Sequence, residues 1–273
     1  MSRRSIVDLI NNSAKELPAN RKFQSDVMSA IERVDLLSQR KGSNFYKPSS
    51  LACLRNMYFT RIGAEQDNTT SSYQGIGMAD TGTRRHEAIQ DVLLQLKDLG
   101  YDWEYLDVAE YVLAKQAEGK CQSIEILEKC GAETHLRDNF LHTSFRVDGV
   151  VRRISTNEYF LFEFKNQTSF KYRGKQMVDP EHVMQVTCYC QSLDLNKALV
   201  LYENRDVCEL ICPEVFEVTD VMKQELCVDR ILECESYVER LEVPPKPLDE
   251  KKAKCQWCSY THECRKAGRY GKI

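Results

Sequence analysis

Hydrophobic and polar residues alternate along residues 145–165, and this period of two predicts a pair of β-strands joined by a short polar loop. The hydrophobic positions would share one buried face of the hairpin: Val147, Val151, Phe160, Phe162 and Phe164. The other face would carry the charged residues Asp148, Glu163 and Lys165. The stretch therefore predicts a half-buried hairpin whose chemistry lies on one side.

A loop over residues 155–158 would set the register of this hairpin. It places Asp148 opposite Lys165 and Val150 opposite Glu163, so that the three charged residues share a face. Residues at neighbouring positions of an antiparallel pair lie about 5 to 7 Å apart, so Asp148 and Glu163 can hold one ion between their carboxylates. Such hard oxygen ligands suit Mg²⁺ or Mn²⁺. The alternative is an ordinary hairpin with a solvated charged face.

The remaining pattern predicts an α/β fold with a central mixed β-sheet flanked by helices. Helices are expected at residues 6–17, 23–37, 82–99 and 220–241, and another begins at Asp179 and Pro180. A short helix that holds Cys53 would follow a cap at Ser49 or Ser50. Strand-like runs lie at residues 105–114, 124–129, 198–202 and 209–217, and a polar surface loop is expected at 64–75.

Three helical positions carry candidate chemistry. His86 lies one turn before Ile89 on the apolar stripe of its helix, so its imidazole is expected to face inward. Gln185 and Tyr189 lie one turn apart on a polar face, where they can contact a nucleotide or position Lys165. A hydrogen-bonded core histidine and a solvated helix face are the simpler alternatives.

Composition limits the class of protein. The chain has 273 residues, of which 42% are hydrophobic and 29% charged, as in soluble globular proteins. No apolar run approaches the roughly 20 residues of a membrane helix, and the first residues do not resemble a signal peptide, so we expect a cytoplasmic protein without a membrane partner. A net charge of −3 excludes a globally basic surface but permits a local positive channel. Its candidates are Arg84, Arg85, Arg152, Arg153, Lys171, Arg173 and Lys175.

Cysteines near the end of the chain form a second signal. Cys255, Cys258 and Cys264 follow one another within ten residues, among the 12 cysteines of the chain. In a reducing compartment such a group favours binding of zinc or an iron–sulfur cluster, each of which usually takes four ligands. The fourth ligand is His262, which would make a local zinc knuckle, or the distant Cys53. The sequence leaves both possibilities open.

These motifs, in this order, resemble the RecB-type nucleases of the PD-(D/E)XK superfamily, in particular the iron–sulfur branch with the CRISPR-associated exonucleases and the AddB nuclease domain. The resemblance covers residues 49–264, and Val147 departs from it, since the superfamily has a proline before the aspartate. The matching elements are Ser49-Ser50-Leu51-x-Cys53-x-Arg55-x2-Tyr58, Gly82-x3-His86, Asp148, Glu163-x-Lys165, Gln185-x3-Tyr189 and the three C-terminal cysteines.

The resemblance implies a role for each matching residue. His86, Asp148, Glu163 and the backbone carbonyl of Phe164 would bind the divalent metal. Lys165 would orient or activate the attacking water, next to the catalytic acids Asp148 and Glu163. Gln185 and Tyr189 would support DNA binding. A 4Fe-4S cluster would be held by the remaining motif residues, namely Cys53, Cys255, Cys258 and Cys264.

The resemblance also implies a domain organisation and an activity. It implies a nuclease domain over residues 46–273 with a restriction-endonuclease-like core, in which the cluster joins the two ends; the helical pattern before it predicts a helical extension over residues 1–45, which the resemblance does not cover. The expected activity is hydrolysis of DNA by a Mg²⁺- or Mn²⁺-dependent exonuclease that acts on single-stranded ends, in recombination, repair or CRISPR-type DNA processing, with protein partners in such a complex. The alternative is a catalytically silent iron–sulfur or zinc protein that binds DNA or docks a partner.

Overall fold

The computed structural model of the chain describes residues 19–38, 43–67, 72–130, 133–249, 255 and 258–268. They belong to two compact units. One unit holds α2 (Ala19–Ser38) and the start of α4 (Tyr73–Leu93) as far as Thr81; the other holds residues 43–67 and everything described from Gly82 onward. The helix expected at residues 6–17 lies outside the described residues.

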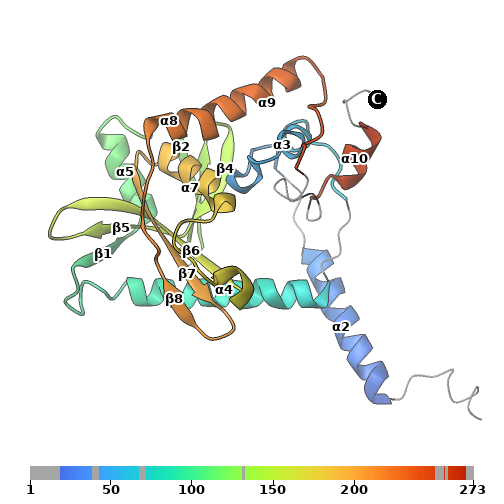
Figure 1. Cartoon of the computed structure of the whole chain (residues 1–273), viewed down its shortest axis with the longest axis horizontal. Helices are drawn as coiled ribbons and strands as arrows, with labels where there is room; N and C mark the ends of the chain where they lie inside the picture. Colours follow the sequence, from blue (N-terminus) through green and yellow to red (C-terminus); the bar gives the residue numbers. More distant parts are fainter. Residues whose placement is uncertain are drawn as a thin grey trace, which may run out of the picture. The chain divides into compact units, whose positions relative to one another are not determined.

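Two β-sheets form the centre of the larger unit, and the prediction of an α/β fold with a mixed sheet is confirmed (Figure 1). The six-stranded sheet has the order β1-β5-β6-β7-β8, with β9 also paired to β7; β6 and β7 are parallel and the other pairs antiparallel. Its strands are β1 (Trp103–Leu106), β5 (Gly149–Arg153), β6 (Glu158–Gln167), β7 (Lys197–Asn204), β8 (Glu209–Ile211) and β9 (Val215–Glu217). A smaller antiparallel sheet contains β2 (Ile124–Cys130), β3 (Glu133–Asp138) and β4 (Thr143–Val147).

Helices cover both faces of the larger sheet. On one face Phe160, Phe162 and Phe164 pack against Ile89 and Leu93 of α4. On the other face the sheet packs against α5 (Val108–Ala117) and α7 (Pro180–Ser192). The other face of β6, which carries the charged residues, is buried as well, since Leu161 and Glu163 are both buried there. The half-buried hairpin expected from the sequence is therefore wrong.

The strand predicted at residues 105–114 is also wrong, because the strand ends at Leu106 and helix α5 begins. Asp107 causes the change, since its carboxylate accepts hydrogen bonds from the amides of Ala109 (2.9 Å) and Glu110 (3.1 Å) and so caps the helix.

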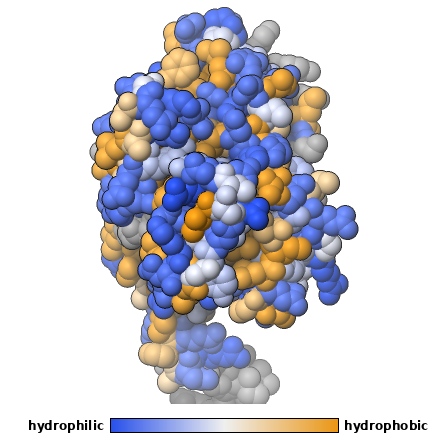
Figure 2. Space-filling view, turned by 90° about the vertical axis from the view of Figure 1, so that its left-hand side faces the viewer, coloured by the Kyte–Doolittle hydropathy of each residue, from blue (hydrophilic) through white to orange (hydrophobic). Residues whose placement is uncertain are grey.

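On the side of the molecule that carries α5, hydrophilic and hydrophobic residues are interspersed (Figure 2).

A second core joins the remaining helices. Tyr46, Met57, Phe59, Cys188 and Ile231 are among its buried residues. The elements that contribute to it include η1 (Pro48–Ser50), α3 (Leu54–Arg61), η2 (Gln224–Val228) and α9 (Asp229–Glu239), with α8 (Asp220–Lys223) and α10 (Thr261–Lys266) next to them; the short α6 (Ser169–Tyr172) follows β6. Among the described residues, no helix is both long and apolar enough to span a membrane.

Several element boundaries differ from those predicted. Cys53 precedes α3 as its N-cap residue and does not lie within a helix, and no serine side chain caps that helix. Helix α4 begins at Tyr73, inside the expected loop, and ends at Leu93. The helix expected at residues 220–241 contains a π-helical segment, and the strand expected at 209–217 is divided into β8 and β9.

Asp148 marks the point where the chain passes from the small sheet to the large one, between β4 and β5. A Cβ atom on the following residue, Gly149, would lie 2.3 Å from Cε2 of Tyr105. The Tyr105 ring cannot move away freely, because its hydroxyl donates a hydrogen bond to the carbonyl oxygen of Asp148 (2.6 Å). Only glycine permits this approach of β1 to the passage between the sheets.

We expect Gly149→Ala to lower the free energy of unfolding by about 1 to 3 kcal/mol, because the added methyl group displaces the ring of Tyr105 and breaks its hydrogen bond. Urea unfolding measures the loss. The same substitution in a Tyr105→Ala background should cost much less, since the clashing ring is gone. Gly82→Ala in α4, where the added Cβ meets open space, is the matched control and should not destabilise. Equal losses in both backgrounds would contradict the steric explanation.

Candidate active site

Asp148 is held from three directions. Its carbonyl oxygen accepts hydrogen bonds from Nε2 of Gln90 (2.8 Å) and from the hydroxyl of Tyr105 (2.6 Å). Its carboxylate oxygen Oδ2 accepts from the amide of Phe164 (2.7 Å). Asp148 is 6% exposed. Because backbone and side chain are both fixed, the second oxygen, Oδ1, has a defined direction.

That oxygen faces His86. Nδ1 of His86 lies 3.4 Å from Oδ1 of Asp148, and the imidazole packs edge-on against the ring of Phe164, with 4.8 Å between ring centroids. Burial disfavours a charged imidazole, but the nearby carboxylate of Asp148 outweighs burial and raises the pKa of His86. The structure thus places His86 inward, as predicted, and next to one of the predicted acids.

The strand register differs from the predicted one. Val150 pairs with Leu161 and Gly149 with Phe162, so the next opposed residues are Asp148 and Glu163. The prediction that Asp148 lies opposite Lys165 is wrong by two residues. A shift by an even number leaves each side chain on its own face, which is why the charged residues still share one.

Glu163 and Lys165 form a network with helix α7. Nζ of Lys165 lies 2.5 Å from Oε1 of Glu163, and Nε2 of Gln185 donates to the same oxygen (3.1 Å). Gln185 also accepts from Lys165 (3.3 Å) and donates to the hydroxyl of Tyr189 (2.8 Å). Glu163 is 3% exposed. The residues predicted on one helix face therefore hold the lysine and the acid in place.

Burial decides the electrostatics of this network. Burial and the charge of Asp148 raise the pKa of Glu163, although Lys165 opposes the rise. Burial disfavours the Lys165 ammonium, but Glu163 outweighs burial and raises its pKa, so the lysine is positively charged. The second oxygen of Glu163, Oε2, is buried without a hydrogen-bond partner among the described residues. A buried carboxylate oxygen of this kind is a natural cation ligand.

A further acid, Glu133, was missing from the sequence prediction. Ligand atoms of His86, Glu133 and Asp148 all lie within 4.8 Å of one another. In the ladder between β3 and β4, Thr134 pairs with Val147, so the next opposed residues are Glu133 and Asp148. Burial and Asp148 raise the pKa of Glu133. Glu133 could have been found only from the pairing register of β3 with β4, and no sequence motif specifies that register.

The donor set fits a divalent cation. An imidazole nitrogen and carboxylate oxygens of Glu133, Asp148 and Glu163 are ligands that Mg²⁺ and Mn²⁺ accept. The predicted ligand group of His86, Asp148 and Glu163 is brought together only in part, because the ligand atoms that lie within 4.8 Å of one another belong to His86, Glu133 and Asp148 and not to Glu163. The role of the Phe164 carbonyl stays a prediction.

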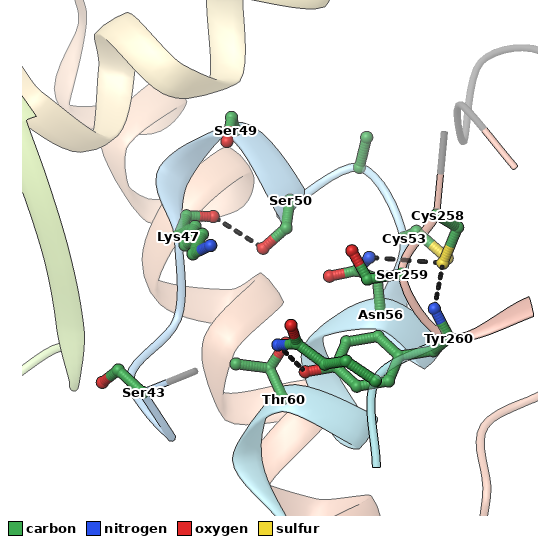
Figure 3. A pocket seen from close by; sticks show the side chains of 12 residues that line it. Ser43, Lys47, Ser49, Ser50, Cys53, Asn56, Thr60, Cys258, Ser259 and Tyr260 are labelled. Carbon is green, nitrogen blue, oxygen red and sulfur yellow. Dashed lines mark hydrogen bonds between the residues drawn. The ribbon is translucent and has the colours of Figure 1, made fainter. Parts of the chain in front are cut away.

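The predicted cysteines line a second site. Cys53, Cys255, Cys258 and Cys264 all border one cavity of about 850 Å³, which His262 does not line. Segments from both ends of the described larger unit thus border this cavity, and Figure 3 shows Cys53 and Cys258 next to each other, although among the described residues no three cysteine sulfur atoms lie within 4.8 Å of one another. Burial raises the pKa of the Cys53 thiol, and the nearby Cys258 and Cys264 add to the rise.

Hydrogen-bond donors surround these sulfur atoms. Nη1 of Arg55 lies 3.3 Å from Sγ of Cys264, and Nδ2 of Asn56 lies 3.4 Å from Sγ of Cys258 (Figure 3). The Arg55 guanidinium is buried and also donates to the carbonyl oxygens of Pro244 and Gly268. Donors of this kind stabilise negative charge on sulfur.

The chain matches no protein-family model and none of the curated proteins. Among the solved structures to which it is similar is the crystal structure of SSO0001, with a TM-score of 0.44 and 15% sequence identity over 91% of this chain and 97% of that chain. A similarity of this size does not support an argument about fold or function. The fold and the site together define an α/β protein with a histidine and three acids at the junction of two sheets.

We expect Glu133→Gln to weaken Mn²⁺ binding about tenfold or more, because it removes a charged ligand next to His86 and Asp148. Isothermal titration calorimetry with the metal alone measures this change. Glu125→Gln on the exposed part of β2 is the matched control and should bind as the unaltered chain does. Equal affinity of both variants would exclude Glu133 from the cation site.

Proposed function

We propose that the chain hydrolyses phosphodiester bonds of DNA with the help of Mg²⁺ or Mn²⁺, as the resemblance to RecB-type nucleases implies. The observation that supports this most is the convergence of His86, Glu133 and Asp148 beside the buried pair of Glu163 and Lys165. These groups come from α4, β3, β6 and the junction between β4 and β5. Lys165 lies beside Glu163 and Arg146 lies 3.8 Å from Glu133, but burying acids still costs free energy, which a cation at the junction would offset.

His86, Glu133, Asp148 and Oε2 of Glu163 would hold the ion. A divalent cation at such a site lowers the pKa of bound water and neutralises charge on a phosphodiester. The hydrogen bond from the Phe164 amide fixes one oxygen of Asp148, which leaves the oxygen beside His86 for the ion. The chain therefore presents its ligands without having to rearrange its backbone.

Lys165 supplies a fixed positive charge next to the reacting phosphate. Its ammonium is positioned by Glu163 and by the side-chain oxygen of Gln185. Gln185 is itself held by its contact with the hydroxyl of Tyr189. A cation placed in advance, in a site with little water, stabilises negative charge that develops in the transition state. Gln185 and Tyr189 are thus positioning residues in this proposal.

We further propose that Cys53, Cys255, Cys258 and Cys264 hold a 4Fe-4S cluster. Their common cavity supports this assignment, and it favours Cys53 over His262 as the fourth ligand, because His262 does not border the cavity. The buried Arg55 supplies positive charge beside Cys264, which suits a thiolate-bound cluster of negative charge. The cluster would join the N-terminal and C-terminal parts of a restriction-endonuclease-like domain.

Asp148→Asn and Lys165→Ala should each lower the rate of cleavage about a hundredfold or more, because they remove a metal ligand and the fixed cation. Digestion of end-labelled single and double strands with Mg²⁺ or Mn²⁺, analysed at nucleotide resolution, measures this rate; EDTA should abolish it. Circular dichroism controls for folding. Full activity of either variant would exclude that residue from catalysis, and no cleavage by the unaltered chain would support the silent DNA-binding or docking protein.

Protein purified without oxygen should be brown and contain about four irons per chain, as four thiolate ligands imply. Cys258→Ala should reduce the iron content strongly. Cys121→Ala is the matched control, because Cys121 packs against the main core and does not border the cysteine cavity. Iron and zinc are measured by mass spectrometry of the purified chain. A colourless protein with one zinc would show that the site is a zinc centre.

A further inference from the structure

A hollow of about 300 Å³ lies directly beside the catalytic lysine of the proposed site. It is lined in part by Lys165, Gln167, Lys171, Glu181, His182 and Arg205. Three of these side chains are cationic and one is an acid. The hollow shares Lys165 with the candidate active site, so a ligand that occupies both would be continuous from one to the other.

The fold explains why polar groups gather there. Strands β6 and β7 are parallel and end at Gln167 and Asn204, so their carboxyl ends meet at the hollow. The first turn of the 13-residue helix α7 provides Glu181 and His182. Ligands of α/β sheets bind outside the carboxyl ends of the strands, and a helix N-terminus favours an anion. Topology and charge therefore agree on a negatively charged ligand.

A metal ion is not the ligand that these contacts favour. Ligand atoms of Asp179, Glu181 and His182 do lie within 4.8 Å of one another. Asp179, however, already contacts Nζ of Lys175 (2.5 Å) and accepts a hydrogen bond from Gln167 (2.6 Å). Three cationic side chains and one acid line the hollow, so its lining carries a net positive formal charge.

Lys171 and Glu181 form the adjustable part of the hollow. Nζ of Lys171 lies 3.0 Å from Oε1 of Glu181, and the side chain of the lysine is 56% exposed. An ion pair this exposed is weak and exchanges readily for another anion. Glu181 therefore occupies the position at which an incoming phosphate would meet Lys171.

An exposed aromatic residue lies next to Lys171 in the chain. Phe170, in the short helix α6, is 90% exposed. Exposing a phenylalanine to this extent leaves its ring without packing partners in the folded chain. Aromatic rings beside a positive groove are the arrangement on which bases of a single strand stack.

We propose that this hollow binds the phosphate group next to the reacting one in a nucleic-acid strand, with Lys171 and Arg205 as its ligands, and that Phe170 stacks on the adjoining base. This proposal rests on the proposed function, because the position of the phosphate along the nucleic-acid strand is defined relative to the bond that is cleaved. It deepens that function, because it names residues outside the metal site that hold the substrate.

The first test measures binding without cleavage. In EDTA, the Lys171→Gln and Arg205→Gln double variant should bind a fluorescent single-stranded oligonucleotide about tenfold more weakly, and its salt slope should fall by about 0.7, as expected for one phosphate that is no longer neutralised. The control replaces one lysine and one arginine from exposed ion pairs outside the hollow, Lys97→Gln with Arg240→Gln. Equal losses in both double variants, or no loss in the first, would overturn the subsite.

Two single variants test the parts of the subsite separately. Glu181→Gln should bind the oligonucleotide several-fold more tightly, because it removes the acid that competes for Lys171. Phe170→Ala should bind about fivefold or more weakly, and this loss should disappear with an oligonucleotide that lacks bases, since stacking needs the base. Weaker binding by Glu181→Gln, or the same loss from Phe170→Ala with both probes, would contradict the proposed contacts.

Failure of the nuclease proposal gives a different result. If the chain binds strands through the hollow but does not cleave them, the binding experiments succeed and the digestion with Mg²⁺ or Mn²⁺ fails. If it cleaves but Lys171 and Arg205 are irrelevant, digestion succeeds and the double variant matches its control. The kinetic readout is the ratio of kcat/KM values: the double variant should lose more on a trinucleotide than on a dinucleoside monophosphate, which has no neighbouring phosphate.

Discussion

The fixed position of Asp148 is the constraint on which the candidate site depends. Two sheets meet at this residue, and its carbonyl oxygen is bound by Gln90 from α4 and by Tyr105 from β1. These bonds join the helix that carries His86 to the strands that carry the acids. Because Gly149 lets Tyr105 approach, a residue without a side chain is as necessary to the site as any of the charged groups.

Two pairs of strands each bring an acid opposite Asp148. The ladder of β3 and β4 brings Glu133 opposite Asp148, and the ladder of β5 and β6 brings Glu163 opposite it. Three acids in adjoining positions repel one another, and the raised pKa values of Glu133 and Glu163 express this repulsion together with burial. The cationic Lys165 offsets part of it. A divalent cation bound between the acids would offset the remaining repulsion.

The sequence predicted the parts of this site that depend on a period of two, and missed those that depend on long-range pairing. Alternation places Asp148, Glu163 and Lys165 on one face under either register, so an error of two residues in the loop did no harm. Glu133 could not be found in this way, because the pairing of β3 with β4 is not written in any local pattern. The error at Asp107 was local: a helix cap was overlooked within an apolar run.

Helix α7 connects the two halves of the proposed function. Val186 and Tyr189 pack in the main core between the sheet and α5, whereas Cys188, on another side of the same helix, packs in the second core with Met57 and Ile231. The second core also contains Cys258 and Cys264 at its edge. Packing at the cysteine cavity is therefore connected, through the second core, to the helix that holds Gln185 against Lys165. Interiors are packed too densely for one side of such a helix to shift alone, so a change of packing at the cysteine cavity would alter the position of Gln185.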